Sequence, residues 1–407
     1  MEQSVLRAYA RLIARVGAGI RPGQTVILQT ELDQPDFVTM LTEECYEAGA
    51  ASVRVEWSHQ PLQKLHVKYR TPERLGAVAE WEKAKLEDMV ENLPCRIYLE
   101  SEDPDGLDGI DQAKMAKGQQ ARSRIIKPYR DRMEGKYQWC IAAVPGKGWA
   151  KKVFPDKSEE DAVEALWQAI LTASRATGDP VAAWEAHNAD LRERCAYLNS
   201  LGLRSLHYTA GNGTDFTVGM IPQAHFCGGQ ETTPAGNVYN PNIPSEECFI
   251  SPMRGQAEGI VYSSKPLSWQ GQLIDEFWFR FEGGRVVDCG GKRNGELLQK
   301  LITMDEGAAY LGECALVPWS GPINRTGILF NNTLFDENAC CHLALGMGFA
   351  DTIEGYHEKT LDEIHALGVN DSIIHVDFMI GTADLSIDGI TEDGRTVPVF
   401  RGGEWAF

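Results

Sequence analysis

The sequence lacks the patterns that define several common classes of protein. It has no run of about 18 apolar residues that could cross a membrane, although 43% of its 407 residues are hydrophobic. Its ten cysteines include no Cys-x-x-Cys pair, so we expect reduced core residues instead of a disulfide framework or a zinc ribbon. Positive charge is scarce: 39 lysines and arginines stand against 58 acidic residues, for a net charge of −19. This balance argues against a nucleic acid or an anionic membrane as a partner.

Signatures of nucleotide binding and of zinc-protease helices are also missing. The glycines at 211 and 213 have no third glycine after them, and segment 145–148 lacks the spacing of a phosphate-binding loop. His357-Glu358 is followed by Leu361 where a His-Glu-x-x-His helix has its second histidine. The amphipathic segment 2–17 has no signal-type apolar block, so we expect a cytoplasmic protein.

The first half of the chain alternates helical and strand-like segments. Apolar spacing predicts helices at 2–17, 33–48, 71–91, 110–133 and 159–177, with strands at 25–30, 52–57, 95–99 and 138–144. Strands that alternate with helices form a mostly parallel sheet with helices on both faces. A chain of 407 residues exceeds the usual size of one core. We therefore predict an α/β N-terminal domain over residues 1–190.

The second half has a different texture. After a predicted helix at 182–201, glycine, proline and asparagine become frequent and the strands become short and alternating. Such strands are predicted at 203–209, 276–282 and 285–288, with a hairpin turn at 282–285 and a helix at 295–304. These features predict an α+β C-terminal domain, rich in antiparallel strands, over residues 191–407.

Residues 373–380 form the most informative strand-like segment. Successive side chains of a strand point to opposite faces, so His375 and Asp377 share one face while Val376, Phe378 and Ile380 take the other. An imidazole and a carboxylate held side by side suit a metal ion. A buried ion pair that satisfies itself fits the same pattern.

Further candidate ligands lie in strand-like or turn-like frames of the same domain. The candidates are Glu247, Glu313, His342, His375 and Asp377, and Glu246 adjoins the first of them. Two imidazoles and three carboxylates exceed the three protein ligands of a mononuclear hydrolytic zinc site. With one bridging carboxylate they fit two divalent ions about 3.5–4 Å apart. Spacing alone does not establish such a site, because scattered Glu and His residues are usually surface or capping groups.

Four sequence blocks resemble the bacterial thermophilic metallo-aminopeptidase family of the aminopeptidase T, S and II type. The blocks are NIPSEECF (242–249), GECALV (312–317), NTLFDENACCHLALG (332–346) and HVDFMIGT (375–382). With further similarity in the N-terminal half and in the tail at 398–406, the resemblance covers essentially the whole chain. It implies that Glu247, Glu313, His342, His375 and Asp377 bind two divalent ions (zinc, cobalt or manganese), with Glu313 bridging. It also implies a homodimer in which the N-terminal domain restricts access to the site.

The activity that this resemblance implies is removal of N-terminal residues from short peptides. A hydroxide bridging the two metal ions would attack the peptide carbonyl, and Glu246 or Glu313 would transfer the proton. The alternative uses His342, His375 and Asp377 as the two-histidine, one-carboxylate triad of an iron(II) ring-cleaving dioxygenase, a relative of the same fold. Both Glu247 and Glu313 are present in recognisable blocks, which favours two metals.

The sequence departs from the family at one position and leaves two acidic residues open. The family often has an active-site tyrosine seven residues after the first ligand histidine, where this chain has Phe349. Tyr356 is a candidate to supply the missing hydroxyl. Asp336 and Glu337 precede His342 and are candidates either to orient its free ring nitrogen or to cap a helix.

Overall fold

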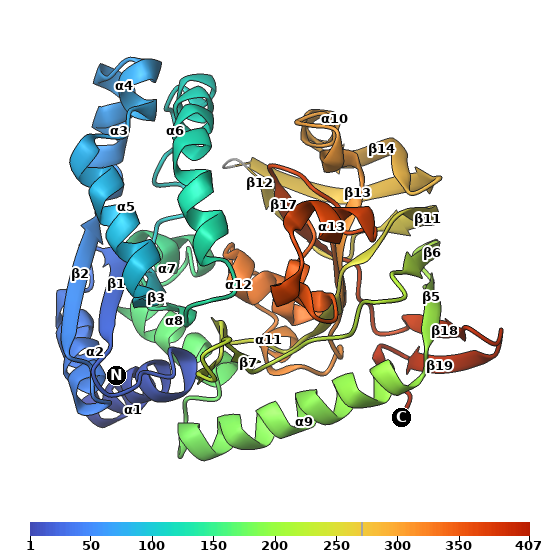
Figure 1. Cartoon of the computed structure of the whole chain (residues 1–407), viewed down its shortest axis with the longest axis horizontal. Helices are drawn as coiled ribbons and strands as arrows, with labels where there is room; N and C mark the ends of the chain where they lie inside the picture. The colour runs from blue at the N-terminus through green and yellow to red at the C-terminus, as the bar shows by residue number, and fades with distance from the viewer. Residues whose placement is uncertain (270–271) are drawn as a thin grey trace. The chain divides into compact units, whose positions relative to one another are not determined.

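The computed structural model describes residues 1–269 and 272–407, which form two compact units (Figure 1). The first unit comprises residues 1–184 and 230–243, and the second comprises residues 185–229 and 244–407. Helix α9 (Pro180–Ser200) contains the point at which the chain first leaves unit 1. The first unit contains a parallel sheet and the second is rich in antiparallel strands, so the predicted fold class is confirmed.

The first unit is built on a five-stranded parallel sheet in the order β2-β1-β3-β4-β9. Its strands are β1 (Thr25–Glu31), β2 (Ser52–Ser58), β3 (Cys95–Glu100), β4 (Trp139–Ala143) and β9 (Asn242–Ile243). A separate two-stranded ladder pairs β7 (Glu231–Thr232) with β8 (Val238–Tyr239). In β1, Val26, Ile27 and Leu28 are all buried, so both faces of this strand are covered.

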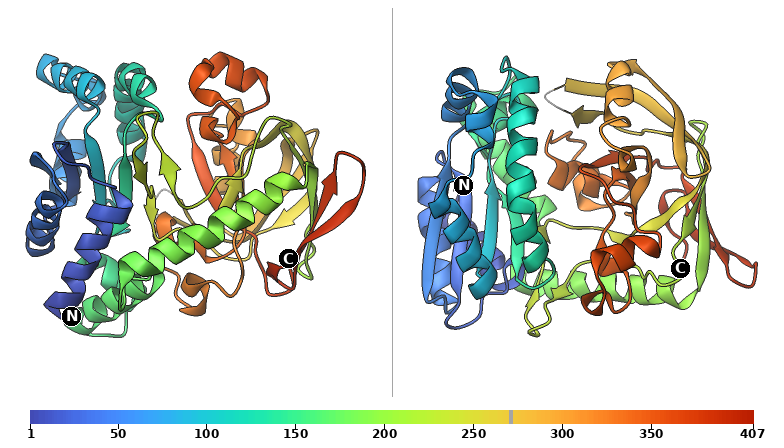
Figure 2. Two further views of the ribbon diagram at one scale, coloured as in Figure 1. Left: turned by 60° about the horizontal axis from the view of Figure 1, so that its bottom comes forward. Right: turned by 45° about the horizontal axis from the view of Figure 1, so that its top comes forward.

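Helices cover this sheet (Figure 2), and distinct apolar groups of side chains pack them against it. Met89 and Met133 form one group with Ile27 of β1. Tyr9, Phe37 and Trp167 form another, with ring centroids 5.5–6.3 Å apart. The helices are α1 (Gln3–Leu12, continued by the π-turn Ile13–Gly17), α2 (Pro35–Glu47), α3 (Gln60–Tyr69), α4 (Pro72–Gly76), α5 (Glu80–Asn92), α6 (Gln112–Met133), α7 (Lys147–Val153) and α8 (Glu159–Ala173).

The prediction of one helix over residues 71–91 is wrong, because the structure divides this segment into α4 and α5. Gly76 ends α4 where it lies against α6: a Cβ there would come within 2.7 Å of Ala121 Cβ. The chain is extended at Ala77, and α5 begins after Ala79, whose N–H donates to the Glu82 carboxylate. Close packing against another helix therefore overrides the helical periodicity. Helices α3 and α7 were not predicted.

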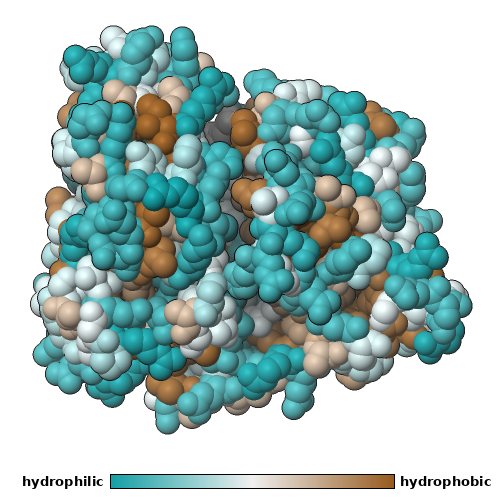
Figure 3. Space-filling model, in the orientation of Figure 1, coloured by the Kyte–Doolittle hydropathy of each residue, from teal (hydrophilic) through white to brown (hydrophobic). Residues whose placement is uncertain are grey.

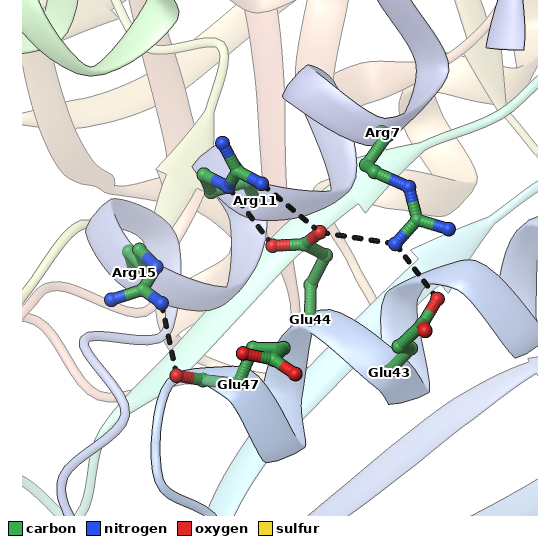
Figure 4. A pocket seen from close by; sticks show the side chains of 6 residues that line it. All are labelled: Arg7, Arg11, Arg15, Glu43, Glu44 and Glu47. Carbon is green, nitrogen blue, oxygen red and sulfur yellow. Dashed lines mark hydrogen bonds and ion pairs between the residues drawn. The ribbon is translucent and has the colours of Figure 1, made fainter. Parts of the chain in front are cut away.

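A row of arginines joins α1 to α2 (Figure 4). The buried carboxylate of Glu44 accepts hydrogen bonds from Arg7 at 3.3 Å and from Arg11 at 3.0 Å. Arg7 also donates to Glu43, and Arg15 donates to the backbone carbonyl of Glu47. A buried carboxylate needs such partners. The cluster therefore holds the two helices together, and its arginines are not free for an anionic ligand.

The second unit contains a large, mostly antiparallel sheet and a small antiparallel sheet. The large sheet has the order β12-β13-β11-β6-β5-β18-β19-β20, with β14 paired to β13, and the small one has the order β10-β15-β16-β17. The large sheet consists of β5 (Leu203–Thr209), β6 (Asp215–Met220), β11 (Pro252–Tyr262), β12 (Leu267–Trp269), β13 (Gln272–Glu282), β14 (Arg285–Arg293), β18 (Ser386–Thr391), β19 (Thr396–Arg401) and β20 (Glu404–Trp405). The predicted hairpin turn is confirmed, because Glu282 pairs with Arg285 across Gly283 and Gly284.

The small sheet packs on the large one. Its strands are β10 (Cys248–Ile250), β15 (Leu311–Leu316), β16 (His342–Gly346) and β17 (His375–Met379). Phe378 of β17 lies 5.0 Å from Phe279 and 6.1 Å from Phe277 of β13, measured between ring centroids. Short helices complete the unit: α10 (Glu296–Leu301), α11 (Pro322–Arg325), α12 (Thr333–Asp336) and α13 (Leu361–Ala366).

The surface in view is predominantly hydrophilic, with separate apolar patches (Figure 3). This agrees with the large excess of acidic residues in the sequence. Among the described residues, no helix has both the length and the apolar character that crossing a bilayer requires.

Candidate metal centre

The small sheet presents one face to the core and the other to a group of polar side chains. Leu343 of β16 and Phe378 of β17 belong to the core cluster and are at most 1% exposed. Their strand neighbours point the opposite way, which places His342, His375 and Asp377 on the second face. The alternation predicted for residues 373–380 is therefore confirmed for this pair.

The strand register aligns the polar side chains across neighbouring strands. Ala344 lies opposite Glu313 of β15 on one side and Asp377 of β17 on the other. His342 lies opposite Ala315. Alanine fills little volume, so these positions leave room above the sheet between the longer side chains.

Five of the predicted site residues come together in two groups. The first group is Glu247, Glu313 and His342, and the second group is Glu313, His375 and Asp377. Within each group, one ligand atom per residue lies within 4.8 Å of the others. Glu313 belongs to both groups. Residues separated by up to 130 positions in the sequence therefore form one continuous set of potential ligands.

Both imidazoles are oriented by backbone carbonyls. His342 Nδ1 lies 3.3 Å from the Cys340 carbonyl oxygen, and His375 Nδ1 lies 2.7 Å from that of Met347. A carbonyl oxygen only accepts hydrogen bonds, so each Nδ1 carries the proton. In a neutral ring the lone pair is then on Nε2, as ligation through Nε2 requires.

Each Nε2 faces the carboxylates. His342 Nε2 lies 3.2 Å from Glu247 Oε2, and His375 Nε2 lies 3.1 Å from Glu313 Oε2. The same His375 Nε2 is 3.2 Å from Asp377 Oδ1, yet that buried oxygen accepts no well-formed hydrogen bond among the described residues. A buried carboxylate oxygen without a donor is unfavourable unless a cation lies beside it.

Burial and crowding of like charges shift the acid–base equilibria of the group. Burial raises the pKa of Glu313 to about 7, although the hydrogen bond from His375 opposes this shift. Burial lowers the pKa of His342, but the hydrogen bond to Glu247 and the neighbouring carboxylates raise it more, to about 9. The protein thus compensates part of the buried negative charge with protons. Divalent cations would compensate it more completely, and carboxylate and imidazole are suitable donors for them.

Glu246 is buried beside Glu247, but its carboxylate belongs to neither group of potential ligands. Its backbone N–H donates to Asn338 Oδ1 at 2.7 Å. Asn338 is fully buried and so fixes the backbone just before Glu247.

Glu337, one of the two acidic residues singled out before His342, is influenced by three carboxylates of the group. Burial raises its pKa well above the usual range, and the charges of Asp377, Glu247 and Glu313 raise it further. Glu337 also hydrogen bonds with Asp377. The signal available was its position in the FDENACC segment, where two acidic side chains precede His342.

The expectation that Asp336 or Glu337 orients the His342 ring is wrong, because the Cys340 carbonyl occupies Nδ1. The Asp336 carboxylate instead accepts from the N–H groups of Phe330 and Asn332, at 2.8 and 3.1 Å. It therefore stabilises the turn before α12, and since α12 has no side-chain cap at its N-terminus, the alternative of helix capping is not confirmed.

Phe349 lies beside the metal centre. Its ring centroid is 4.8 Å from that of His375 and 5.6 Å from that of Phe249. Tyr356 packs instead against a separate apolar cluster that includes Ile353, and its ring lies 3.8 Å from that of His357.

Buried carboxylates and imidazoles gathered beside one sheet are typical of a metalloenzyme. The chain belongs to the thermophilic metalloprotease (M29) family, whose model matches residues 2–405. It is therefore a hydrolase that acts on peptide bonds with the help of a divalent metal.

Relatives of known identity cover almost the whole chain. Aminopeptidase AmpS of Bacillus subtilis is 41% identical over 405 residues, covering 99% of this chain and 98% of the relative. Aminopeptidase T of Thermus aquaticus is 39% identical, covering 98% of each chain. The solved structure of wild-type AmpT from Thermus thermophilus superposes with a TM-score of 0.91 at 37% identity, covering 100% of both chains.

A second solved structure shares the fold only. It is 2,5-dihydroxypyridine dioxygenase from Pseudomonas putida, with a TM-score of 0.52 and 12% identity, covering 98% of this chain and 96% of that one. At this identity the likeness does not extend to activity.

Proposed function

We propose that this protein is an aminopeptidase that removes N-terminal residues from short peptides with two divalent ions. The main observation in support of this proposal is that the two groups of potential ligands share Glu313. A carboxylate has two oxygens, so it can bridge ions about 3.5–4 Å apart. Zinc, cobalt and manganese are the metals that suit this mixture of donors.

The ligands divide naturally around the bridge. Glu247 and His342 serve one ion, and His375 and Asp377 serve the other, as their distances group them. Glu337 lies close enough to Asp377 for a hydrogen bond and is the candidate for a further carboxylate ligand. The names of the aminopeptidase relatives and the family match support this reading.

Divalent ions bound here polarise the scissile carbonyl and lower the pKa of the attacking water. The protein's own groups must then transfer the proton. Glu313 is committed to bridging, so we assign this role to Glu246, whose carboxylate would accept the proton from water and return it to the leaving amine. Asn338 holds the Glu246 backbone in place for this step.

The charge of the site favours a substrate with a free amino group. The three carboxylates of Glu247, Glu313 and Asp377 carry three negative charges, whereas two divalent ions carry four positive charges. Deprotonation of the attacking water would balance this difference, and the buried Glu246 remains as an additional acid beside Glu247. An excess of acidic groups attracts an N-terminal ammonium group and repels a C-terminal carboxylate.

A substrate panel tests the proposal. After chelation and return of zinc, cobalt or manganese, we expect hydrolysis of amino-acid amides and dipeptides but not of their N-acetylated forms. Elemental analysis should find about two ions per chain. One iron per chain with no peptidase activity would favour the dioxygenase alternative, and a chain that binds no metal would contradict both functions.

We also propose that the protein is a homodimer, as the family resemblance implies, and that it is cytoplasmic, as expected from the segment 2–17. Light scattering after gel filtration tests the dimer: a single species of about twice 45.1 kDa is expected.

Metal affinity is expected to rise with pH. The pKa of about 9 means that His342 is protonated at neutral pH in the metal-free protein, whereas its reference value is about 6.5. Its pairing with Glu247 therefore stabilises the metal-free fold fully below pH 6.5, and this contribution is lost as the pH rises through 9. Metal binding must displace this proton.

We expect the apparent Kd for metal to fall about tenfold per pH unit between about pH 7 and 9, and to level off above that range. Calorimetry in buffers of different ionisation enthalpy measures the released protons directly. At a fixed, limiting metal concentration, activity at pH 5 should lie far below that at pH 8. Equal affinity at pH 7 and pH 9 would contradict this coupling.

Phe349→Tyr is expected to raise kcat with little change in KM. The ring already contacts His375, so the substitution adds one hydroxyl donor beside the centre. A donor used mainly in the transition state improves kcat selectively. A change below about threefold, together with a sharp loss in Tyr356→Phe, would show that Tyr356 already provides the donor. If both substitutions are silent, no tyrosine takes part.

A further inference from the structure

The Met347 carbonyl orients the His375 ring, and the two glycines that flank Met347 add little stiffness of their own, although the Met347 N–H donates to the Ile374 carbonyl at 2.7 Å. Met347 stands between Gly346 and Gly348, just beyond the end of β16. Gly346 has a φ of +106°, a conformation that residues with a side chain rarely adopt. Glycine is also the most flexible residue when it is not held. The position of this carbonyl must therefore be fixed by contacts from elsewhere in the chain.

Asn370 holds the segment on both sides of Met347. Its side-chain Nδ2 donates to the Gly346 carbonyl at 2.6 Å, and its backbone carbonyl accepts from Gly348 N–H at 2.8 Å. The same Nδ2 donates to the Gly307 carbonyl at 2.9 Å. Asn370 is 1% exposed, so bulk water does not compete for these bonds.

The Asn370 side-chain amide is oriented so that its N–H donors have hydrogen-bond partners while its carbonyl acceptor has none among the described residues. Its Oδ1 is buried with no hydrogen-bond partner among the described residues, which is unfavourable for a polar atom. The two carbonyls that Nδ2 contacts can only accept. An aspartate side chain has the same shape but no N–H, so it would leave both carbonyls without this donor.

We infer that Asn370 is a positioning residue of the metal centre. By holding the segment 346–348, it keeps the Met347 carbonyl against His375 Nδ1, and so keeps Nε2 aimed at Glu313 and Asp377. This inference rests on the proposed function, because it takes His375 as a metal ligand. Partners that orient a ligating imidazole change metal affinity by about 10–100-fold.

The test compares metal binding with catalysis in Asn370→Asp. The metal-free variant is titrated with zinc in competition with a chelating dye, and activity is measured at limiting and at saturating zinc. We expect the Kd of the weaker-bound ion to rise about tenfold or more. Because His375 itself remains, activity should recover to within a few-fold of the wild type at saturating zinc. If this variant does not fold, Asn370→Ser, which leaves space for water, undergoes the same measurements.

Ser372→Ala provides the matched control. Ser372 lies in the same loop. Its hydroxyl donates to Asp305 at 2.8 Å and accepts from the Ile374 N–H at 3.2 Å, and among the described residues it has no hydrogen bond to the segment 346–348. We expect this variant to lose thermal stability but to keep the wild-type Kd for zinc. An equal loss of affinity in both variants would assign the effect to general loosening of the loop and overturn the inference, as would an unchanged Kd in Asn370→Asp. If the wild type binds no metal, the proposed function itself fails.

Discussion

Glu313→Gln should abolish peptidase activity while leaving the fold intact. Glu313 is 4% exposed and belongs to both groups of potential ligands, so among the candidate ligands it is the position whose charge two bound ions would share. A neutral amide has a single good acceptor oxygen and cannot bridge two cations. Measured metal content should fall from about two ions per chain to one or none, and kcat/KM should fall by several orders of magnitude.

Circular dichroism is expected to show an unchanged fold for this variant. Removing a buried like charge relieves repulsion with Glu247 and Asp377, so the metal-free variant should be no less stable than the metal-free wild type. Glu306→Gln is the matched control, because Glu306 is exposed and, within the described part of the second unit, forms its ion pair with Arg254. Full activity of Glu313→Gln with two ions bound would refute the bridging role.

Removal of metal should both stop activity and destabilise the protein. Without cations, the sheet buries Glu247, Glu313 and Asp377 close together, and only protonation or histidine pairing limits their repulsion. A ligand that binds only the folded state stabilises it by RT ln(1 + [L]/Kd), about 4 kcal/mol per site at a thousandfold excess over Kd.

We therefore expect the thermal midpoint to fall by several degrees after dialysis against a chelator, and to rise again with added metal in a concentration-dependent way. Scanning calorimetry measures the shift, and magnesium at the same concentration tests whether it requires a metal that accepts imidazole ligands. Activity and midpoint should recover over the same range of metal concentration. An unchanged midpoint with full loss of activity would mean that the ions bind too weakly to contribute to stability.

Part of this centre could be predicted from the sequence because a strand has a fixed period. In residues 373–380 the alternation placed His375 and Asp377 opposite Phe378, and the buried Phe378 confirms that choice. The α/β character of the first unit was equally accessible, since the apolar run of β1 is long enough to be buried on both faces. The assignment of metal ligands stays a prediction.

The remaining features depend on contacts between distant segments. The order β10-β15-β16-β17 places the Glu313 strand β15 next to the His342 strand β16, with the His375 strand β17 beyond it, and nothing in a single strand specifies its neighbours. The ring partners of His342 and His375 are backbone carbonyls, and any residue type has one. The break between α4 and α5 likewise depends on where α6 approaches Gly76.

The late return of residues 230–243 to the first unit has a consequence for synthesis on the ribosome. β4 ends at Ala143, and among the described residues its outer edge is paired by β9 at Asn242 and Ile243, about a hundred residues later. At bacterial elongation rates that interval lasts on the order of ten seconds. During this time the nascent sheet has an unpaired edge, the kind of surface on which strands of other molecules add. A polypeptide released before residue 243 would retain that edge permanently, so truncated chains of this protein should aggregate even where the first unit is otherwise complete.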